Sequence, residues 1–558
     1  MSIAAANDTE TNDTKVCKDE VEPTQSELAT LEHVSDRFPF TTWLLIFGQL
    51  CEQFVYFGTY IVFQNYIQFP IPTNGEKQAG ALGYGRKMAT AVTMSYSCLC
   101  NLSPIAAAII ADQFWGRYKT LTVASFVYFV GLIILVLTSI PALTKIGVGF
   151  PGLICALIVI GLAVGAFKSI MGPFMAEQYS RKAPVIKVVK GQRKILSPEM
   201  TIQSLFNWFY WAANFGAFIA ELITPTVEKY HSFWLAYFLA SAIFPCCIIV
   251  LFVGRRRFTR QSPTGSLVVR AFRVTWNALA NRWKLGKQSA NEHLLDYAKG
   301  RHVSNDTKRT TEQTKNEFID DLKQTFHACR VFVFFPLFWM CFNQEVTNLT
   351  SQAAQMNVGP LPNDLLQTIN PLVVVVFVPI FDKIVYPMLR KCHIKFGPIE
   401  RITWGFIVTA LGMAWIAIVQ HLIYSTAPNF DYTVQPCSTC QKFNNITVAW
   451  QIPARFLIGI GEIFAVISGI EYAYVKAPTS MKSIVMALFV CARAVGSLLN
   501  VALVPVNTDP IIIWMYVSLA IGTFIIGIIF YLCLRNDDKQ MLLKGAPKRA
   551  ESTLSVAT

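Results

Sequence analysis

The apolar runs of this chain constrain its fold more than any other feature. A bilayer core of roughly 30 Å needs about 20 apolar residues per helix, and about twelve runs in the 558 residues meet that length. Only 15% of the residues are charged and 53% are hydrophobic, far from the balance of a soluble chain. We therefore expect an all-α membrane protein with spans near residues 40–66, 87–111, 120–140, 151–177, 201–222, 232–253, 329–354, 363–389, 400–424, 448–475, 479–504 and 510–534.

Positive charge lies mainly between the apolar runs, although the net charge is +14. This distribution fits the positive-inside rule better than a basic face for nucleic acid, so we expect no nucleic-acid partner. The connections at 178–200 and 254–257 are rich in Lys and Arg, whereas the alternate loops are nearly free of them. Both termini are therefore predicted to be cytosolic, with 1–39 as a disordered tail and not a signal peptide, and 535–558 as a second tail.

A long polar segment, 254–328, divides the spans into six and six. The division predicts two six-helix bundles, 40–253 and 329–534, with a binding site between them near the midplane, as in transporters built from two related halves. Within the segment, Phe272 and Trp276 share one helical face and basic residues occupy another. This amphipathic helix either lies on the inner membrane surface or packs on the cytosolic ends of the bundles.

The first span carries an acid, Glu52, within the stretch G-Q-L-C-E-Q-F-V-Y-F-G. An acid at the centre of a span costs about 3 kcal/mol or more unless it faces a cavity or a partner. Glu52 is therefore a candidate functional residue. Two interpretations stay open, one in which Glu52 titrates during function and one in which it is a neutral packing acid bonded to Gln49 or Gln53.

Three further stretches place polar side chains at defined points of the spans. In A-A-I-I-A-D-Q-F-W-G-R-Y-K-T-L, Asp112 can accept hydrogen bonds from a neighbouring helix end while Arg117 holds the inner surface, a latch suited to gating. In F-N-W-F-Y-W-A-A-N-F-G-A-F, Gly216 permits close helix approach and Asn214 is an amide on an apolar face. The third stretch, G-E-I-F-A-V-I-S-G-I-E-Y-A-Y-V-K-A-P-T-S-M-K-S, covers 461–483.

Together with the stretch around Glu52, these motifs resemble the proton-coupled oligopeptide transporter family of the major facilitator superfamily. The runs G-A-F-K-S at 165–169 and A-E-Q-Y at 176–179 are similar to its fungal branch. The resemblance covers about residues 40–534. It implies a major-facilitator fold that moves di- and tripeptides together with protons by alternating access.

The resemblance also implies roles for individual residues. Substrate contacts are implied for the positions that match the family pattern, namely Lys168, Asn214, Gln344, Asn370 and Glu471. Proton coupling is implied for Glu52 and Glu471, and gating for Asp112 and Arg117.

The first-span motif departs from the family pattern E-x-x-E-R-F-x-Y-Y-G. Gln49, Gln53 and Phe57 replace its first Glu, its Arg and its second Tyr. Tyr60 stands where a further Arg is frequent, and Asn101 stands at a second-span Tyr position. Of these residues, we place Gln53, Phe57, Tyr60 and Asn101 on the substrate path. Because an amide lacks arginine's two-bonded grip on a carboxylate, the pocket is predicted to suit amines but to lack its usual carboxylate clamp.

Arg493 is a candidate for the missing clamp. It lies about 18 Å along the eleventh span from the start near Met481, at 1.5 Å per residue, where an arginine needs a carboxylate partner or a wet cavity. It either reaches the substrate path or forms a structural ion pair with Glu462 or Glu345. Arg455, near the outer end of its helix, is expected to extend to the membrane interface.

The cysteines do not predict a disulfide framework, since most of the 14 lie in apolar runs. Cys437 and Cys440, in a polar loop, are either a local disulfide or two free thiols. We expect no metal, no cofactor and no enzymatic activity, because no metal-ligand cluster or nucleophile and base pair occurs at a recognisable spacing. Asn445, in an external N-x-T sequence, is a candidate for glycosylation.

Three functional hypotheses follow. The first is a monomeric plasma-membrane transporter of small peptides or peptide-like amines, coupled to protons. The second keeps the fold but carries a modified or non-peptide metabolite, without protons or in the export direction, since the first-span motif has lost charges. The third is a receptor that senses nutrients without moving them, with the 254–328 segment as its output.

Overall fold

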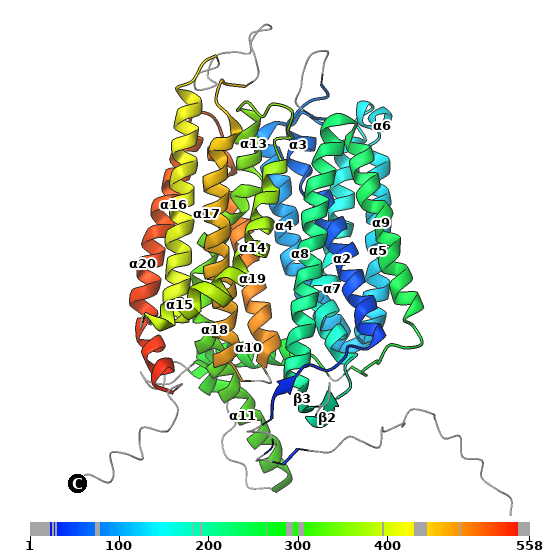
Figure 1. The fold of residues 1–558 in the computed structure, drawn as a ribbon, viewed down its shortest axis with the longest axis vertical. Helices are drawn as coiled ribbons and strands as arrows, with labels where there is room; N and C mark the ends of the chain where they lie inside the picture. Colours follow the sequence, from blue (N-terminus) through cyan, green and yellow to red (C-terminus); the bar gives the residue numbers. More distant parts are fainter. Residues whose placement is uncertain are drawn as a thin grey trace, which may run out of the picture.

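Two groups of long helices stand side by side in the computed structural model, with shorter elements gathered at one end (Figure 1). We call that end, which holds the segment between the two halves, the linker end, and the opposite end the far end. The structure describes residues 23–24, 27, 31–72, 79–181, 183–189, 192–263, 265–285, 294–298, 306–392, 396–428, 443–478 and 481–544. Cys437 and Cys440 lie outside these residues.

The N-terminal half forms the group drawn in blue to green on the right of Figure 1. Its large apolar core is drawn from residues 45–258, with Leu45, Tyr128 and Phe244 fully buried. Its elements are α2 (Phe40–Tyr60), α3 (Phe63–Gln68), α4 (Gly85–Ile110), η1 (Ala111–Trp115), α5 (Arg117–Thr138), α6 (Pro141–Lys145), α7 (Gly149–Glu177), α8 (Pro198–Tyr230) and α9 (Phe233–Val253).

The C-terminal half forms the other group, and two further apolar cores within residues 328–534 hold it together. Several of its spans are interrupted by short 3₁₀ or π-helical turns. Its elements are η3 (Cys329–Val333), α12 (Phe335–Phe342), η4 (Asn343–Glu345), α13 (Asn348–Ala354), η5 (Leu365–Thr368), α14 (Ile369–Ile380), η6 (Phe381–Val385), α15 (Tyr386–Lys391), α16 (Pro398–Tyr424), η8 (Val448–Gln451), α17 (Ile452–Glu462), η9 (Ile463–Ile467), α18 (Ser468–Lys476), α19 (Lys482–Ala502), η11 (Val504–Val506) and α20 (Ile512–Lys544).

The linker contains α10 (Leu267–Leu285), η2 (Leu294–Ala298) and α11 (Asp306–Ala328). One face of α10 packs with α11 against Met481 and Ile484 of the C-terminal half. The face predicted to be apolar points away from this core, since Phe272 and Trp276 are 67% and 60% exposed. The helix α10 therefore packs on the protein through one face and leaves its aromatic face exposed at the linker end.

A small sheet at the linker end was not predicted. Its strands are β1 (His33–Val34), β2 (Val185–Val189) and β3 (Gln192–Leu196), in the order β1-β3-β2. The β2–β3 pair is antiparallel, and β1 adds in parallel to β3. The expectation of a disordered tail over 1–39 is thus wrong for β1. Its backbone pairs with the hairpin β2–β3, a basic segment that we expected only as a connection between spans.

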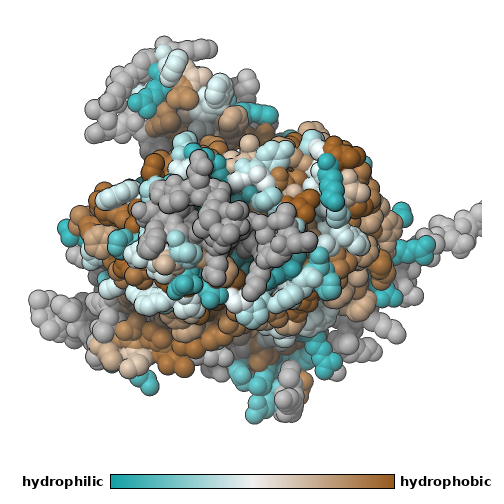
Figure 2. Space-filling model, turned by 90° about the horizontal axis from the view of Figure 1, so that it is seen from above, coloured by the Kyte–Doolittle hydropathy of each residue, from teal (hydrophilic) through white to brown (hydrophobic). Residues whose placement is uncertain are grey.

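The lipid-facing surface agrees with a multi-pass membrane protein. Within the described residues, eight helices are long and apolar enough to cross a bilayer, and a ninth counts if the bent pair 316–333 and 335–354 is one span. The other predicted spans fall on α2 with α3, on α8 and on the short helix 365–380, which are polar or interrupted, so the count of twelve stays a prediction. Seen from the far end, hydrophobic residues colour much of the rim and hydrophilic ones gather on the end face (Figure 2).

Close helix contact inside the N-terminal half depends on Gly216, as its sequence context predicted. A Cβ atom on this residue of α8 would lie 2.4 Å from the carbonyl oxygen of Leu50 on α2. Real carbon and oxygen atoms do not approach so closely, so only glycine lets α2 and α8 meet here. The contact fixes α2, with its acid, against the helix that faces the other half.

Candidate functional site

Polar and charged side chains from both halves converge between them. On α2, Glu52 is fully buried and accepts a hydrogen bond of 2.7 Å from the amide of Gln53. Its second oxygen, Oε1, has no hydrogen-bond partner among the described residues. The first-span motif thus supplies an acid with one free oxygen and an amide that fixes the other.

Lys168 of α7, in the same half, is a cation that interacts electrostatically with this acid. Its Nζ atom lies 3.4 Å from the hydroxyl of Tyr56 and 4.5 Å from the centre of that ring. The side chain is exposed, yet it interacts electrostatically with Glu52. A lysine in the middle of a span that is exposed and interacts with groups of both halves is expected to face a water-filled space between them.

Arg493 approaches the same cavity from α19 of the C-terminal half. Its guanidinium carbon lies 4.6 Å from the ring centre of Trp339, a cation–π contact. It interacts electrostatically with Lys168 and with Tyr60 of α2, and its Nε atom has no hydrogen-bond partner in the described part of the chain. Two cations from opposite halves therefore face one space, and the Nε–H group of Arg493 is available as a hydrogen-bond donor.

An acid, Glu462 at the end of α17, lies near Arg493. It interacts with Arg493 and with the amide of Asn370. From the other half, Tyr210 of α8 interacts with Glu462, and Asn214 donates a 2.9 Å hydrogen bond to the Tyr210 carbonyl. The cavity therefore carries positive charge at Lys168 and Arg493 and a carboxylate from the C-terminal half, a distribution that suits a ligand with charges of both signs.

The structure separates the two acids of the tenth-span motif. Glu471, the predicted substrate and coupling residue, has a side chain that is 52% exposed and pairs with Arg401 at 3.5 Å. It does not join the central groups. Glu462 precedes it by nine residues, about 14 Å along a helix, and the π-helical turn η9 lies between them. The sequence signal for Glu462 is an acid inside a span, and that signal predicted Glu462 only as a partner for Arg493.

Other predicted residues have mainly structural contacts here. Asn101 donates to the Ser97 carbonyl of its own helix at 2.9 Å, and Gln344 donates to Asn500 at 2.7 Å within the C-terminal half. Phe57 packs with apolar residues of the N-terminal half. Tyr60 is the exception, since its ring stacks on Tyr56 at 5.7 Å beside the two cations.

The predicted latch forms inside one half. Arg117 lies 3.9 Å from Asp112 and also forms an ion pair with Glu177, at the linker end of α7. The carbonyl of Asp112 accepts a 3.0 Å hydrogen bond from Gly265 of the linker. These contacts tie the linker to the N-terminal half, and the described contacts of the two residues do not cross to the C-terminal half.

Arg455 is fully buried, so its predicted extension to the membrane interface is wrong. Its Nη1 atom donates to the Glu345 carbonyl at 3.3 Å, and it interacts electrostatically with Glu345 and with Glu221 of α8. Three interior acids, Glu345, Glu221 and Asp364, supply the charge partners that a buried guanidinium needs. Asn370 donates to a side-chain oxygen of Glu345 at 2.8 Å, which joins this buried group to the cavity.

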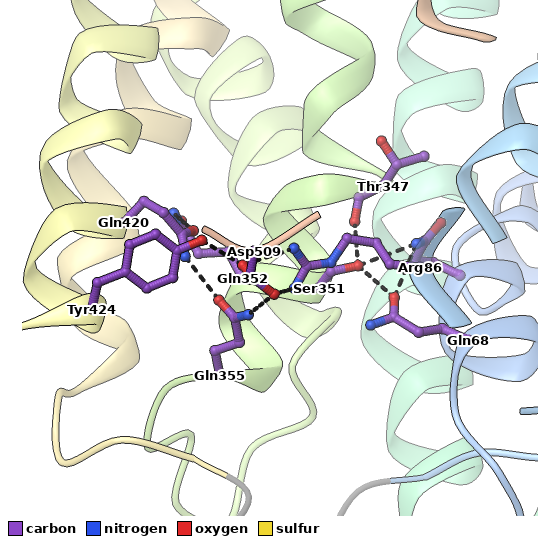
Figure 3. Close-up of polar contacts among 10 residues, drawn as sticks. Gln68, Arg86, Thr347, Ser351, Gln352, Gln355, Gln420, Tyr424 and Asp509 are labelled. Atoms are coloured by element: carbon purple, nitrogen blue, oxygen red, sulfur yellow. Dashed lines mark hydrogen bonds and ion pairs between the residues drawn. The ribbon is translucent and has the colours of Figure 1, made fainter. Parts of the chain in front are cut away.

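Hydrogen bonds between the halves close the far end of the cavity. Arg86 at the start of α4 pairs with Asp509 at 3.1 Å, and Gln355 donates to the same carboxylate (Figure 3). The Ser351 hydroxyl of α13 donates to Gln68 of α3 at 2.5 Å. The far end is thus sealed by polar contacts, while Lys168 and Tyr210 remain exposed on the linker side.

Deeper in the molecule, the hydroxyl oxygens of Ser97 and Ser497 lie 3.0 Å apart across the two halves. This contact places α4 directly against α19, the helix that carries Arg493. Two helical halves that enclose charged groups and meet at one end define a membrane transporter that works by alternating exposure of its site.

Comparison with known proteins identifies the family. Residues 118–521 match the model of the POT family, PTR2, and the chain belongs to that family. It is 38% identical to a probable peptide transporter, ptr2, of Schizosaccharomyces pombe over 92% of this chain and 81% of the relative. It is 32% identical to the peptide transporter PTR2 of Saccharomyces cerevisiae over 93% of this chain and 83% of the relative. These relatives are transporters and not enzymes.

Solved structures support the fold. The POT family transporter PepTSo superposes with a TM-score of 0.70 and 19% identity, over 90% of this chain and 99% of that one. A POT family transporter in complex with 5-aminolevulinic acid superposes with a TM-score of 0.63 and 18% identity, over 88% of this chain and 96% of that one. The major-facilitator fold predicted from the sequence is confirmed.

The placement of the two acids gives a direct prediction. Replacing Glu462 by Gln should weaken binding of dialanine about tenfold to a hundredfold, because a hydrogen bond to a charged group contributes roughly 1.5–3 kcal/mol. Replacing Glu471 by Gln, nine residues further along the same motif, should change it less than about fivefold, since an exposed ion pair contributes about 1 kcal/mol or less. Thermal-shift titration of both purified variants measures the difference, and equal losses would contradict the assignment.

Proposed function

We propose that this protein carries di- and tripeptides across the plasma membrane, coupled to protons, with the linker end and both termini in the cytosol. The observation that supports the substrate best is the cavity in which Lys168 and Arg493 face the same space as Glu462. A small peptide is a zwitterion with its charges at opposite ends. Its carboxylate fits the two cations, and its α-amino group fits Glu462.

Arg493 supplies the carboxylate clamp that the first span has lost. Gln53 occupies the motif's arginine position and is engaged with Glu52. The guanidinium of Arg493 comes from the opposite half and stacks on Trp339, which leaves its donor edge available. Because the two cations come from different halves, a bound carboxylate would draw the halves together. A site with a clamp for a carboxylate supports the hypothesis of ordinary peptides over that of a modified metabolite.

Proton coupling is proposed through Glu52 and Lys168. An ionised Glu52 holds the lysine by electrostatic attraction, whereas a protonated Glu52 releases it to a peptide carboxylate. Binding of a proton to Glu52 therefore favours binding of the peptide carboxylate to Lys168, and binding of the peptide favours protonation of Glu52 in turn. The closed far end and the exposed Lys168 correspond to the inward-facing stage of this cycle.

The carboxylate clamp is tested with a blocked substrate. Wild-type protein should prefer dialanine to dialanine amide, and the Arg493→Gln and Lys168→Gln variants should lose most of that preference while retaining residual binding of the amide. Each charged contact contributes roughly 1.5–3 kcal/mol, so a loss of preference of about tenfold or more is expected. Competition against uptake of a labelled dipeptide into proteoliposomes gives the ratio, and unchanged preference in both variants would contradict the clamp.

The coupling proposal makes a separate prediction. A Glu52→Gln variant keeps the shape of the acid but cannot bind and release a proton, so an inward proton gradient should no longer drive peptide accumulation. Exchange of labelled for unlabelled peptide across proteoliposomes should persist, because exchange needs no net proton movement.

Glu471→Gln is the matched control for this experiment and should accumulate peptide as the wild type does. Gradient-driven accumulation by Glu52→Gln at the wild-type level would show that the coupling acid lies elsewhere.

A further inference from the structure

Two buried carboxyl groups meet at the far end, one from each half. Glu228 lies near the end of α8 and is 3% exposed, and Asp364 directly precedes η5 and is fully buried. The two carboxyl groups interact with each other, and the amide of Asn65 bridges Glu228 to Asn363, the residue before Asp364. A hydrogen bond between two carboxyl groups requires a proton on one of them, since two carboxylates offer only acceptors.

The neighbouring contacts place this pair within the seal between the halves. Asn65 of α3 donates to Glu228 Oε1 at 2.9 Å, and its amide also bonds to Asn363 at 2.8 Å. With both acids ionised, Glu228 Oε2 and both side-chain oxygens of Asp364 lack a side-chain donor within the described residues. One shared proton would pair Glu228 Oε2 with one of the two Asp364 oxygens without any other change.

Charged and titratable groups surround the pair on several elements. Lys229 of α8 donates to the carbonyl oxygens of Gly359 and Leu361. Arg455 of α17 attracts Asp364 but directs its Nη1 atom to the Glu345 carbonyl. The buried hydroxyl of Tyr237 on α9 faces the pair from the N-terminal half. The cations therefore attract the two acids electrostatically, whereas the hydrogen bonds described for these cations go to backbone carbonyls.

We propose that Glu228 and Asp364 form a proton-binding site that exists only while the far end is closed. The proposal rests on the alternating-access function, since opening of the far end separates the two halves and hydrates both acids. Two ionised carboxylates in contact would repel each other at this depth. A single proton converts that repulsion into a hydrogen bond that holds the halves together.

The direction of the pH effect follows from proton counting. The closed state binds one more proton at this pair than the open state does. The ratio of open to closed molecules therefore rises with pH, by up to about tenfold per pH unit for one proton. Acidic conditions hold the far end shut, and this site is distinct from Glu52, which acts at the substrate cavity.

Hydrogen–deuterium exchange of the full chain in lipid nanodiscs, without substrate, tests the proposal. After correction for the intrinsic pH dependence of exchange, the opening ratio of amides in 365–372 and 222–230 should rise severalfold or more from pH 5.5 to pH 8 in the wild type. In Glu228→Gln and Asp364→Asn, a neutral amide takes the place of the protonated acid, so both variants should remain protected across the whole range.

Glu471→Gln is the control, because this acid is 52% exposed, pairs with Arg401 and lies at the opposite end of the molecule from the pair. It should retain the wild-type pH response. A wild type without a pH response, a wild-type response in both pair variants, or an equal loss in the control would each overturn the assignment.

The outcome is separable from the proposed function. Peptide uptake in the proteoliposome assay tests transport, and exchange without substrate tests only the far-end pair. Transport without the predicted pH response would overturn the pair alone, whereas a normal pH response without uptake would overturn the transport proposal alone.

Discussion

A charged side chain inside a bilayer is stable only where it meets an opposite charge, a hydrogen-bond partner or water. This constraint organises the present structure, because Glu52, Lys168, Arg493 and Glu462 could not face lipid. They contact other polar and charged groups instead. Glu52 interacts with Gln53 and Lys168, and Arg493 rests on the Trp339 ring and interacts with Glu462. The chain packs as two groups of helices with separate apolar cores, and we propose that the charged groups between them bind the substrate.

The two ends of the cavity use different chemistry. At the far end, amides, hydroxyls and the Arg86–Asp509 pair bond the halves directly. At the linker end, the described ion pairs of Arg117 stay within the N-terminal half, and the linker packs on the C-terminal half. A site that is sealed by reversible polar contacts on one side and exposed on the other is the arrangement that alternating access requires.

The fold was largely predictable from the sequence, whereas the site was predictable only in part. Apolar length and charge placement indicate the spans, and an ionisable residue within a span indicates the cavity, as for Glu52, Lys168 and Arg493. The choice between Glu462 and Glu471 was not predictable in this way, because the π-helical turn between them leaves no clear pattern in the residues. Arg455 shows the same limit, since its burial depends on carboxylates from distant segments.

The central claim is that Lys168 and Arg493 bind the carboxylate of a peptide whose amino group contacts Glu462. A structure of the protein bound to a dipeptide tests it most directly. We expect guanidinium and ammonium contacts to the carboxylate at roughly 2.7–2.9 Å, with the amine beside Glu462. A peptide bound with its amino group toward Lys168, or held at Glu471 near the linker end, would contradict it.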